Sequence, residues 1–485
     1  MKKVILVSVI CLTGFICTVV FGHNLENFLD SKDETNLGNG KLERILTHKE
    51  LRVVVDFNTI NYFIYKGEPQ GFQYEILKEF CADNGLDLTI DATNNLPLAI
   101  SGLIHDEYDL IAKNVFSGYI DNELVEYTQP LLKTKILLVQ RKNGKASIDS
   151  NVPYVVKNRG ELARRTVHVS GNTSYGFHMQ KLSADLERPI SVVTDTSATT
   201  EQLLEKVSEG IIDYTICNEK TANFVGSLFN NLDFSTPIAF DQEFSWLVAN
   251  KSTKWKEYLD TWIVAFKQSD RYHEICEKYY SESANGIFSQ KKFNSILGGK
   301  LSDYDDVVKS VASVYDFDWR LISSIIYKES RFDTQAKSTV GASGLMQLMP
   351  ITAKLFNVFD TSVPSENIRG GVAYLSWLDD TFAPVIPDEK ERLKFVLASY
   401  NVGIGHVMDA RRLAMKYNRN PSVWDDNVEY FLMKKSEAAF YNDPVVEHGY
   451  CRSAEPLVFV EKVLDRYTHY VNIIPGEEKK SLAAL

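Results

Sequence analysis

Glu329 is the residue of this chain best placed for acid–base chemistry, because it stands on the apolar face of a predicted helix. The stretch Trp319–Ser330 predicts that helix, and Asp318 is a suitable N-cap for it. Burial disfavours the ionised form of a carboxyl group and therefore raises its pKa. A proton that is held up to near-neutral pH is what a general acid needs. The apolar residues of the same face lie three, four and seven positions earlier and are Ile326, Ile325 and Ile322.

The same glutamate has a plainer interpretation, in which it forms a structural ion pair with Lys328 or Arg331. The residues that follow favour a functional site. Gly341 and Gly344 permit a close approach of the backbone, and Leu345–Pro350 supplies an apolar wall that contains one amide. An acid beside a groove of this composition is typical of a sugar-binding cleft.

Three short blocks follow one another in order: Glu329-Ser330, Gly344–Pro350 and Ala398–Gly403. A weaker fourth block contains Asn367 and Tyr374. These blocks resemble the signature blocks of the lytic transglycosylases with the soluble-lytic-transglycosylase, goose-lysozyme-like fold. The resemblance covers roughly residues 300 to 475, and it implies an all-α catalytic domain that acts on peptidoglycan glycan strands without a cofactor or a metal.

The resemblance also implies a mechanism. Ordinary glycosidases use two carboxylates, one of them as nucleophile or base, and the matched blocks supply only Glu329. In this family the 6-hydroxyl of the muramoyl residue replaces the missing nucleophile, so that the product carries a 1,6-anhydro end. One glutamate then serves as acid and afterwards as base, and the intramolecular attack benefits from a high effective molarity. By resemblance, the residues that contact the substrate are Ser338, Gln347, Met349, Tyr400 and Asn401.

The last helix departs from the family pattern. Members commonly carry a glutamate followed by a tyrosine there, whereas this sequence has Glu455 followed by Phe459. We therefore expect the polar contact of that tyrosine to be lost or to come from Tyr450.

The 485 residues are enough for two or three domains, and a hydrophobic content of 44% can build ordinary cores. The net charge of −11 comes from interspersed acidic and basic residues, which argues against a nucleic-acid partner.

The first 22 residues predict a secretory signal peptide, because Lys2 and Lys3 precede a continuous apolar run. We therefore expect an exported protein. The resemblance to the lytic transglycosylases implies that it lies in the periplasm, attached peripherally to the outer membrane. The apolar run is nearly long enough to span a bilayer, so an uncleaved anchor stays open, as does a lipoprotein site at Cys17. Residues 23–45 are polar and predict a linker.

Four cysteines remain after the signal segment, without a Cys-x-x-Cys pair and without a matching histidine pattern. This spacing gives no support to a metal or redox site, and it favours buried single thiols. A disulfide is allowed in an exported protein, but the sequence does not pair these residues. They are Cys81, Cys217, Cys276 and Cys451.

Residues 46–281 predict an α/β domain, because strand-like runs alternate with helical ones. The expected strands include Leu51–Asp56, Leu86–Ile90 and Tyr108–Ala112, and Trp255–Tyr280 is expected as one closing helix. Residues 282–300 are rich in Ser, Asn, Gly and Lys and predict a linker to the catalytic domain, 301–475, which is followed by a tail, 476–485.

Segments of the first domain, among them Gly71-Phe72, Tyr127–Pro130 and Gly171–Ser174, resemble the family-3 bacterial solute-binding proteins. The resemblance implies two lobes with a ligand cleft at their hinge. It also implies that Phe72, Thr173, Ser174 and Asn218 line this cleft, where the N–H groups of a helix starting near Ser174 suit an anion.

Two charged anchors of the amino-acid receptors are altered in this sequence. Asp121 stands where the arginine that clamps the ligand carboxylate is expected, and Asn218 replaces the acid that holds the amine. A free amino acid is therefore a poor candidate, and we expect a muropeptide or another amino-acid-like ligand that regulates the enzyme. The alternative is that the two lobes bind no ligand and are kept for docking or regulation.

A solute-binding-like domain followed by a lytic domain resembles a membrane-bound branch of the lytic transglycosylases. Three functions remain possible on sequence grounds: a peptidoglycan lytic transglycosylase, a lysozyme-type hydrolase on the same fold, and a cell-wall-fragment sensor with a silent catalytic domain. The intact blocks around Glu329 favour the first function.

Overall fold

The computed structural model describes residues 40–476 apart from 118–119, 121–122, 143–154, 172, 187, 196–197, 227–228, 282–287, 289–290 and 453. The chain forms two compact units. The first contains the residues up to Tyr62 and Gln70–Ser289, and the second contains Phe63–Pro69 and Gln290–Leu485. The predicted signal peptide, Asp121 and most of the predicted tail lie outside the described residues.

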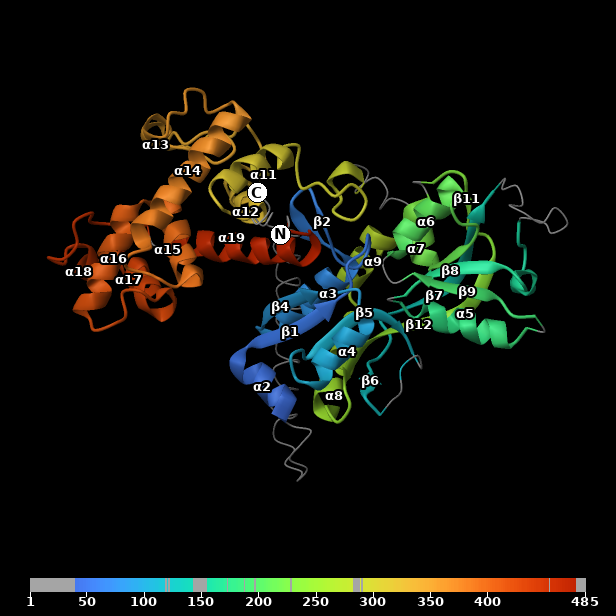
Figure 1. Ribbon diagram of the computed structural model, residues 1–485. Coiled ribbons are helices and arrows are strands. Elements are labelled where there is room, and N and C mark those ends of the chain that lie inside the picture. Colours follow the sequence, from blue (N-terminus) through green and yellow to red (C-terminus); the bar gives the residue numbers. More distant parts are fainter. Residues whose placement is uncertain are drawn as a thin grey trace, which may run out of the picture. The chain divides into compact units, whose positions relative to one another are not determined.

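The first unit is built on one continuous ten-stranded sheet (Figure 1). Eight strands form its path, while β6 (Val125–Tyr127) pairs with β12 and β11 (Leu232–Asp233) pairs with β7. In spatial order the path is β4 (Asp87–Ala92), β1 (Glu50–Val55), β5 (Leu110–Phe116), β12 (Pro237–Ala249), β7 (Leu132–Arg141), β10 (Thr215–Asn218), β8 (Thr166–Ser170) and β9 (Ser191–Asp195).

The strand directions divide this sheet into two lobes. β1, β4 and β5 are mutually parallel at one end, and β10, β8 and β9 are parallel at the other. Between them the long strands β7 and β12 run antiparallel to each other and to their neighbours. The expected α/β, two-lobed domain is thus confirmed, and β7 and β12 are the strands that join the lobes.

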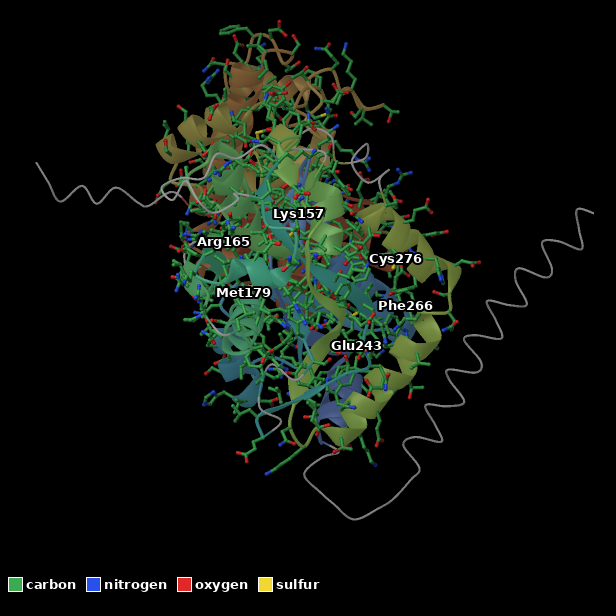
Figure 2. The ribbon with its side chains drawn as sticks, turned by 90° about the vertical axis from the view of Figure 1, so that its right-hand side faces the viewer. Lys157, Arg165, Met179, Glu243, Phe266 and Cys276 are labelled. Carbon is green, nitrogen blue, oxygen red and sulfur yellow. The ribbon has the colours of Figure 1, made fainter. Side chains whose placement is uncertain are left out.

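Helices connect the parallel strands, as parallel pairing requires. The expected single helix Trp255–Tyr280 is wrong in one respect, because it is two helices. Ser269 interrupts it and caps the second one, since its side chain accepts a hydrogen bond from the N–H of Tyr272. Figure 2 labels Phe266 on the first of these helices and Cys276 on the second. The helices of the unit are α2 (Gly40–His48), α3 (Phe72–Asn84), α4 (Leu96–Ile104), η1 (Arg159–Leu162), α5 (Tyr175–Ala184), α6 (Thr200–Glu209), α7 (Glu219–Gly226), α8 (Thr253–Phe266) and α9 (Asp270–Tyr280).

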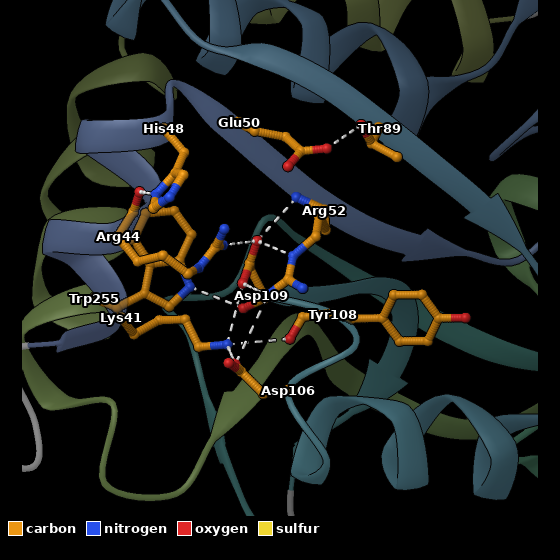
Figure 3. A network of polar contacts seen from close by, with 10 residues as sticks. All are labelled: Lys41, Arg44, His48, Glu50, Arg52, Thr89, Asp106, Tyr108, Asp109 and Trp255. Atoms are coloured by element: carbon orange, nitrogen blue, oxygen red, sulfur yellow. Dashed lines mark hydrogen bonds and ion pairs between the residues drawn. The ribbon is translucent and has the colours of Figure 1, made fainter. Parts of the chain in front are cut away.

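Helix α2 begins at Gly40, inside the segment expected as linker, and a buried carboxylate holds it to the sheet. The side chain of Asp109 is fully buried and pairs with Lys41 at 3.0 Å, with Arg52 at 2.9 Å and with Arg44 (Figure 3). Burial acts to raise the pKa of Asp109, but Arg52 and Lys41 outweigh it and keep that pKa below its ordinary value. The free-energy cost of burying this carboxylate is offset only while its cationic partners stay in place.

The described residues within 290–476 of the second unit form helices joined by loops, as expected for the catalytic domain. Its longest helix, α19 (Ala454–Ile473), packs against α12 and α15, and α15 packs in turn against α14 and α16. The remaining elements are η2 (Lys291–Phe293), α11 (Asp305–Val314), α12 (Trp319–Ser330), α13 (Pro350–Leu355), α14 (Pro364–Phe382), α15 (Glu389–Val402), α16 (Ile404–Lys416), η3 (Trp424–Val428), α17 (Glu429–Lys434) and α18 (Ala438–Tyr441).

A short early segment, Phe63–Pro69, completes this second unit. It contains β2 (Phe63–Tyr65) and the start of β3 (Glu68–Gln70). The carbonyl oxygen of Gly67 accepts a 2.7 Å hydrogen bond from the hydroxyl of Tyr470, which is buried. The carboxylate of Glu68 accepts one from Tyr327, two residues before Glu329 on α12. The segment therefore contacts both α19 and the helix that carries the candidate acid.

No helix among the described residues is long and apolar enough to cross a membrane. The four cysteines after the signal segment are free thiols, three of them buried and Cys276 half-buried. Within the described part of the chain, no group of His, Cys, Asp and Glu side chains suits a metal ion.

Candidate active site

Helix α12 places Glu329 at the end of a buried face. Asp318 caps the helix as expected, because its side chain accepts a 2.8 Å hydrogen bond from the N–H of Arg320. Arg331 ends it in the left-handed conformation, with φ of 52°. The three isoleucines of the predicted apolar face, Ile322, Ile325 and Ile326, are completely buried, which confirms the helical pattern.

Burial raises the pKa of Glu329 to about 8. Lys328 opposes this rise, and the negative charge of Glu455 adds to it. The expectation of a proton held to near-neutral pH is therefore met. At neutral pH the carboxyl group is mostly protonated, which is the form that can protonate a leaving group.

A loop follows the helix and forms one wall of the cleft. The hydroxyl of Ser330 donates to the carbonyl of Leu345 at 2.7 Å and so ties the helix end to the loop. The buried amide of Asn367 accepts from the N–H of Met346 at 2.7 Å and donates to two loop carbonyls. At Gly344 φ is 78°, and an added Cβ would collide with Asn367, so glycine is required there.

One cleft contains all six residues that the sequence predicts for catalysis and substrate binding. Met349 is 39% exposed at the start of α13, so its thioether is open to a ligand. Asn401 and its neighbour Tyr400 reach the cleft from the end of α15. The six residues are Glu329, Ser338, Gln347, Met349, Tyr400 and Asn401.

Tyr400 is held in place by a hydrogen bond and by two rings. Its hydroxyl donates to the carbonyl of Met346 at 2.6 Å, and its ring lies 5.4 Å from that of Tyr374 and 6.5 Å from that of Phe459. Burial, with a contribution from Glu329, raises the pKa of Tyr400 far above its ordinary value. The hydroxyl therefore stays protonated, and its proton points to the backbone while its oxygen remains able to accept.

The two polar side chains of the loop also bond to the loop itself. The hydroxyl of Ser338 accepts from the N–H of Ala342 at 2.9 Å. Both hydrogen bonds of the Gln347 side chain are donated by Nε2, to the carbonyls of Ala336 and Gly344. The amide oxygen of Gln347 is thus the atom that this residue presents to a ligand.

Glu455 is a cleft residue that the sequence prediction did not place among the site residues. It stands in the first turn of α19 and affects the pKa of Glu329 through its charge. The sequence offered one signal that could have identified Glu455 as a site residue, namely that the helix around it departs from the family pattern. Phe459 stacks on Tyr400, and Tyr450 is 58% exposed and is not among the lining residues.

A second cavity lies in the first unit, and Thr173, Ser174 and Asn218 line it. Asn218 is engaged, because its Nδ2 donates to the hydroxyl of Tyr175 and its Oδ1 accepts from the N–H of Thr221. Phe72 is completely buried at 4.7 Å from the ring of Tyr280 and is not among the lining residues.

Two family models match the chain, one on each unit. Residues 51–282 match the bacterial extracellular solute-binding proteins, family 3, and residues 306–423 match the transglycosylase SLT domain.

Several curated relatives are similar over most of the chain. A protein named membrane-bound lytic murein transglycosylase F from Desulfosudis oleivorans is 29% identical over 88% of this chain and 91% of its own length. A protein of the same name from Yersinia pseudotuberculosis is 28% identical over 91% of this chain and 88% of its own.

Solved structures match the first half of the chain. Holo ArgBP from T. maritima has a TM-score of 0.40 and 19% identity, over 49% of this chain and 99% of its own. The BvgS periplasmic domain of B. pertussis has a TM-score of 0.41 and 16% identity, over 50% of this chain and 45% of its own.

Proposed function

This chain belongs to the membrane-bound lytic murein transglycosylases of type F, and we propose that it cleaves the β-1,4 bond between N-acetylmuramic acid and N-acetylglucosamine without water, leaving 1,6-anhydromuramoyl ends. The observation that carries this proposal is that Glu329 lies in one cleft with the five residues expected to contact the substrate, where burial raises its pKa to about 8. The protonated carboxyl group donates its proton to the glycosidic oxygen as the bond breaks. The resulting carboxylate then takes the proton of the muramoyl 6-hydroxyl, whose oxygen closes onto C1.

The other cleft residues position the sugars in this proposal. The amide oxygen of Gln347 and the side chain of Asn401 offer polar contacts to the acetamido and hydroxyl groups of the glycan, and Met349 packs against a ring face. Tyr400 fixes the wall through its bond to the backbone and leaves its oxygen as an acceptor. Ser338 keeps the loop closed through its bond to Ala342.

A lysozyme-type hydrolase is the second candidate, because Glu455 gives the cleft a second carboxylate. In a hydrolase such a group activates water or forms a covalent intermediate. The two candidates differ in their products: a transglycosylase leaves anhydro ends, and a hydrolase leaves reducing ends.

Mass spectrometry of digested sacculi tests both candidates. We expect anhydromuropeptides from the wild type and from Glu455→Gln, and none from Glu329→Gln. The exposed substitution Glu461→Gln on α19 is the matched control and should keep full activity. Reducing ends from the wild type that disappear in Glu455→Gln would overturn the proposal in favour of the hydrolase.

We further propose that a muropeptide or an amino-acid-like ligand in the first unit regulates the enzyme, with Thr173, Ser174 and Asn218 in the wall of its cavity. The support is the match of residues 51–282 to a solute-binding family. The rate of sacculus solubilisation by the full chain, with and without added muropeptides, tests it. An unchanged rate over the whole range of muropeptide concentration would contradict regulation.

The names of the relatives support a membrane-associated location. We propose export to the periplasm by the segment 1–22 and peripheral attachment to the outer membrane. Cell fractionation followed by washing with high salt and with detergent distinguishes peripheral attachment from an uncleaved anchor or a lipid.

A further inference from the structure

The cavity of the first unit carries charges that differ from those of a carboxylate-clamping receptor. Asp56, Glu201 and Lys220 line it, and the described lining residues include no arginine. The ligand that this cavity prefers depends on which of these three charges is free to bind it.

One carboxylate oxygen of Glu201 accepts hydrogen bonds, and the other has no hydrogen-bond partner in the described part of the chain. Glu201 stands in the first turn of α6 and is only 5% exposed. Its Oε1 accepts from the N–H of Thr59 at 3.2 Å and from the hydroxyl of Thr59 at 2.9 Å. Its Oε2 is buried and has no hydrogen-bond partner among the described residues. A buried carboxylate oxygen without a donor is costly, so a donor that enters the cavity gains from pairing with it.

Asp56, by contrast, is already satisfied. Its Oδ2 accepts from the Nδ2 of Asn58 at 2.7 Å, and the Nδ2 of Asn61 lies within 3.1 Å of both oxygens. The charge of the buried Lys113 also acts on it and opposes the rise in its pKa that burial causes. Asp56 adds negative potential to the cavity, but both of its oxygens already accept hydrogen bonds, unlike Oε2 of Glu201.

Lys220 is the cation among the described lining residues of this cavity. Its Nζ lies 5.4 Å from the centre of the Tyr280 ring, and its charge acts on the thiol of Cys276. The charge of Glu201 instead acts on Asp56, Tyr175 and Cys217. Among the described residues, Oε2 of Glu201 therefore has no hydrogen-bond donor, and the negative charge of Glu201 acts on the neighbouring carboxylate of Asp56.

We propose that this cavity binds its ligand through a primary ammonium group, which donates to Oε2 of Glu201 beside Asp56. The chemical class is a small amide-containing amine, such as the side-chain ammonium of a diamino acid within a peptide, without a requirement for a free α-carboxylate. This inference rests on the proposed ligand site of the first unit and names the chemistry of its ligand. The bond is charge-assisted, which is the strong kind of hydrogen bond.

Calorimetric titration of the full chain tests the assignment with matched probes. Nα-acetyl-lysine amide carries one ammonium group and no carboxylate. Its Nε-acetylated form has the same backbone with a neutral amide N–H, and Nα-acetyl-glutamate amide carries the opposite charge. The variants are Glu201→Gln, which keeps an acceptor for Thr59, and Glu205→Gln, an exposed position of the same helix, as control.

We expect the wild type and Glu205→Gln to bind the ammonium probe, and Glu201→Gln to bind it about tenfold to a hundredfold more weakly. We expect the other two probes to bind at least about tenfold more weakly than the ammonium probe. Failure of the wild type to bind the ammonium probe, equal binding of the acetylated probe, or unchanged affinity in Glu201→Gln would each overturn the assignment. Because binding is read without the enzyme reaction, these outcomes are distinguishable from a failure of the proposed glycan cleavage.

Discussion

Replacing Glu329 by glutamine should stabilise the second unit at alkaline pH while it abolishes catalysis. Burial raises the pKa of Glu329 from its ordinary 4.5 to about 8. Between these values the unfolded glutamate is ionised while the folded one keeps its proton. The folded state then holds more protons than the unfolded state, so the stability of the wild type falls as pH rises through this window. Glutamine has no proton to lose and removes this dependence.

The magnitude follows from the two pKa values. They lie about 3.5 apart, 8 minus 4.5, and one pH unit is worth about 1.4 kcal/mol, which gives a ceiling of about 5 kcal/mol. Glu329 is partly exposed, so water screens its charge and we expect about 2 kcal/mol. For a unit of this size, that difference raises the melting temperature by about 4–8 °C.

Differential scanning calorimetry of both proteins at about pH 4 and at about pH 9 measures this effect. We expect nearly equal melting temperatures of the catalytic transition at the acidic value and a higher one for the variant at the alkaline value. Glu461→Gln, which removes an exposed carboxylate of the same unit, should show no such divergence. A gain that is the same at both pH values, or a loss at alkaline pH, would refute the reasoning that burial holds the proton.

Three further predictions follow from contacts described above. The rate of sacculus cleavage should fall as pH rises through about 8, because Glu329 must hold a proton to act as acid; a flat rate profile to higher pH would contradict this. Tyr400→Phe leaves the carbonyl of Met346 without its donor and should cost about 1–3 kcal/mol in the urea unfolding of the second unit, whereas an unchanged midpoint would mean that water replaces the hydroxyl. Asp109→Asn uncouples three cations and should destabilise the first unit by about 3–5 kcal/mol in the same assay; a loss below about 1 kcal/mol would show that the cations separate freely.

Local signals made the site helix predictable in detail. The bounds Trp319–Ser330 follow from a cap at one end and from the isoleucine spacing, and both act within a few residues. The break at Ser269 was also locally encoded, by a serine followed by Asp270 at the start of a helix, but the continuing apolar pattern masked it. In helix α12 the N-cap and the apolar periodicity indicate the same bounds, and the structure has a helix with those bounds.

Most of the features that we could not predict from the sequence depend on pairing between residues that lie far apart in the chain. The strands β7 and β12 owe their existence to partners far along the chain, and no short stretch specifies them. The same holds for Glu455 and Glu201, which reach their cavities only because distant helices bring them there. The residues expected from signature blocks meet in one cleft because those blocks preserve the spacing that the fold requires.

The segment Phe63–Pro69 has a consequence for how this protein is made. It leaves the ribosome early, yet the residues that it contacts, such as Tyr470, are synthesised about 400 positions later. The second unit therefore cannot complete its packing until nearly the whole chain has been translated, and a loop that closes over so many residues is entropically slow to form. A fragment that starts after the linker lacks the carbonyl of Gly67 and leaves a buried tyrosine hydroxyl without its acceptor. The functional boundary of the catalytic domain is thus not a single point in the sequence, and point substitutions are the sounder way to separate the roles of its two units.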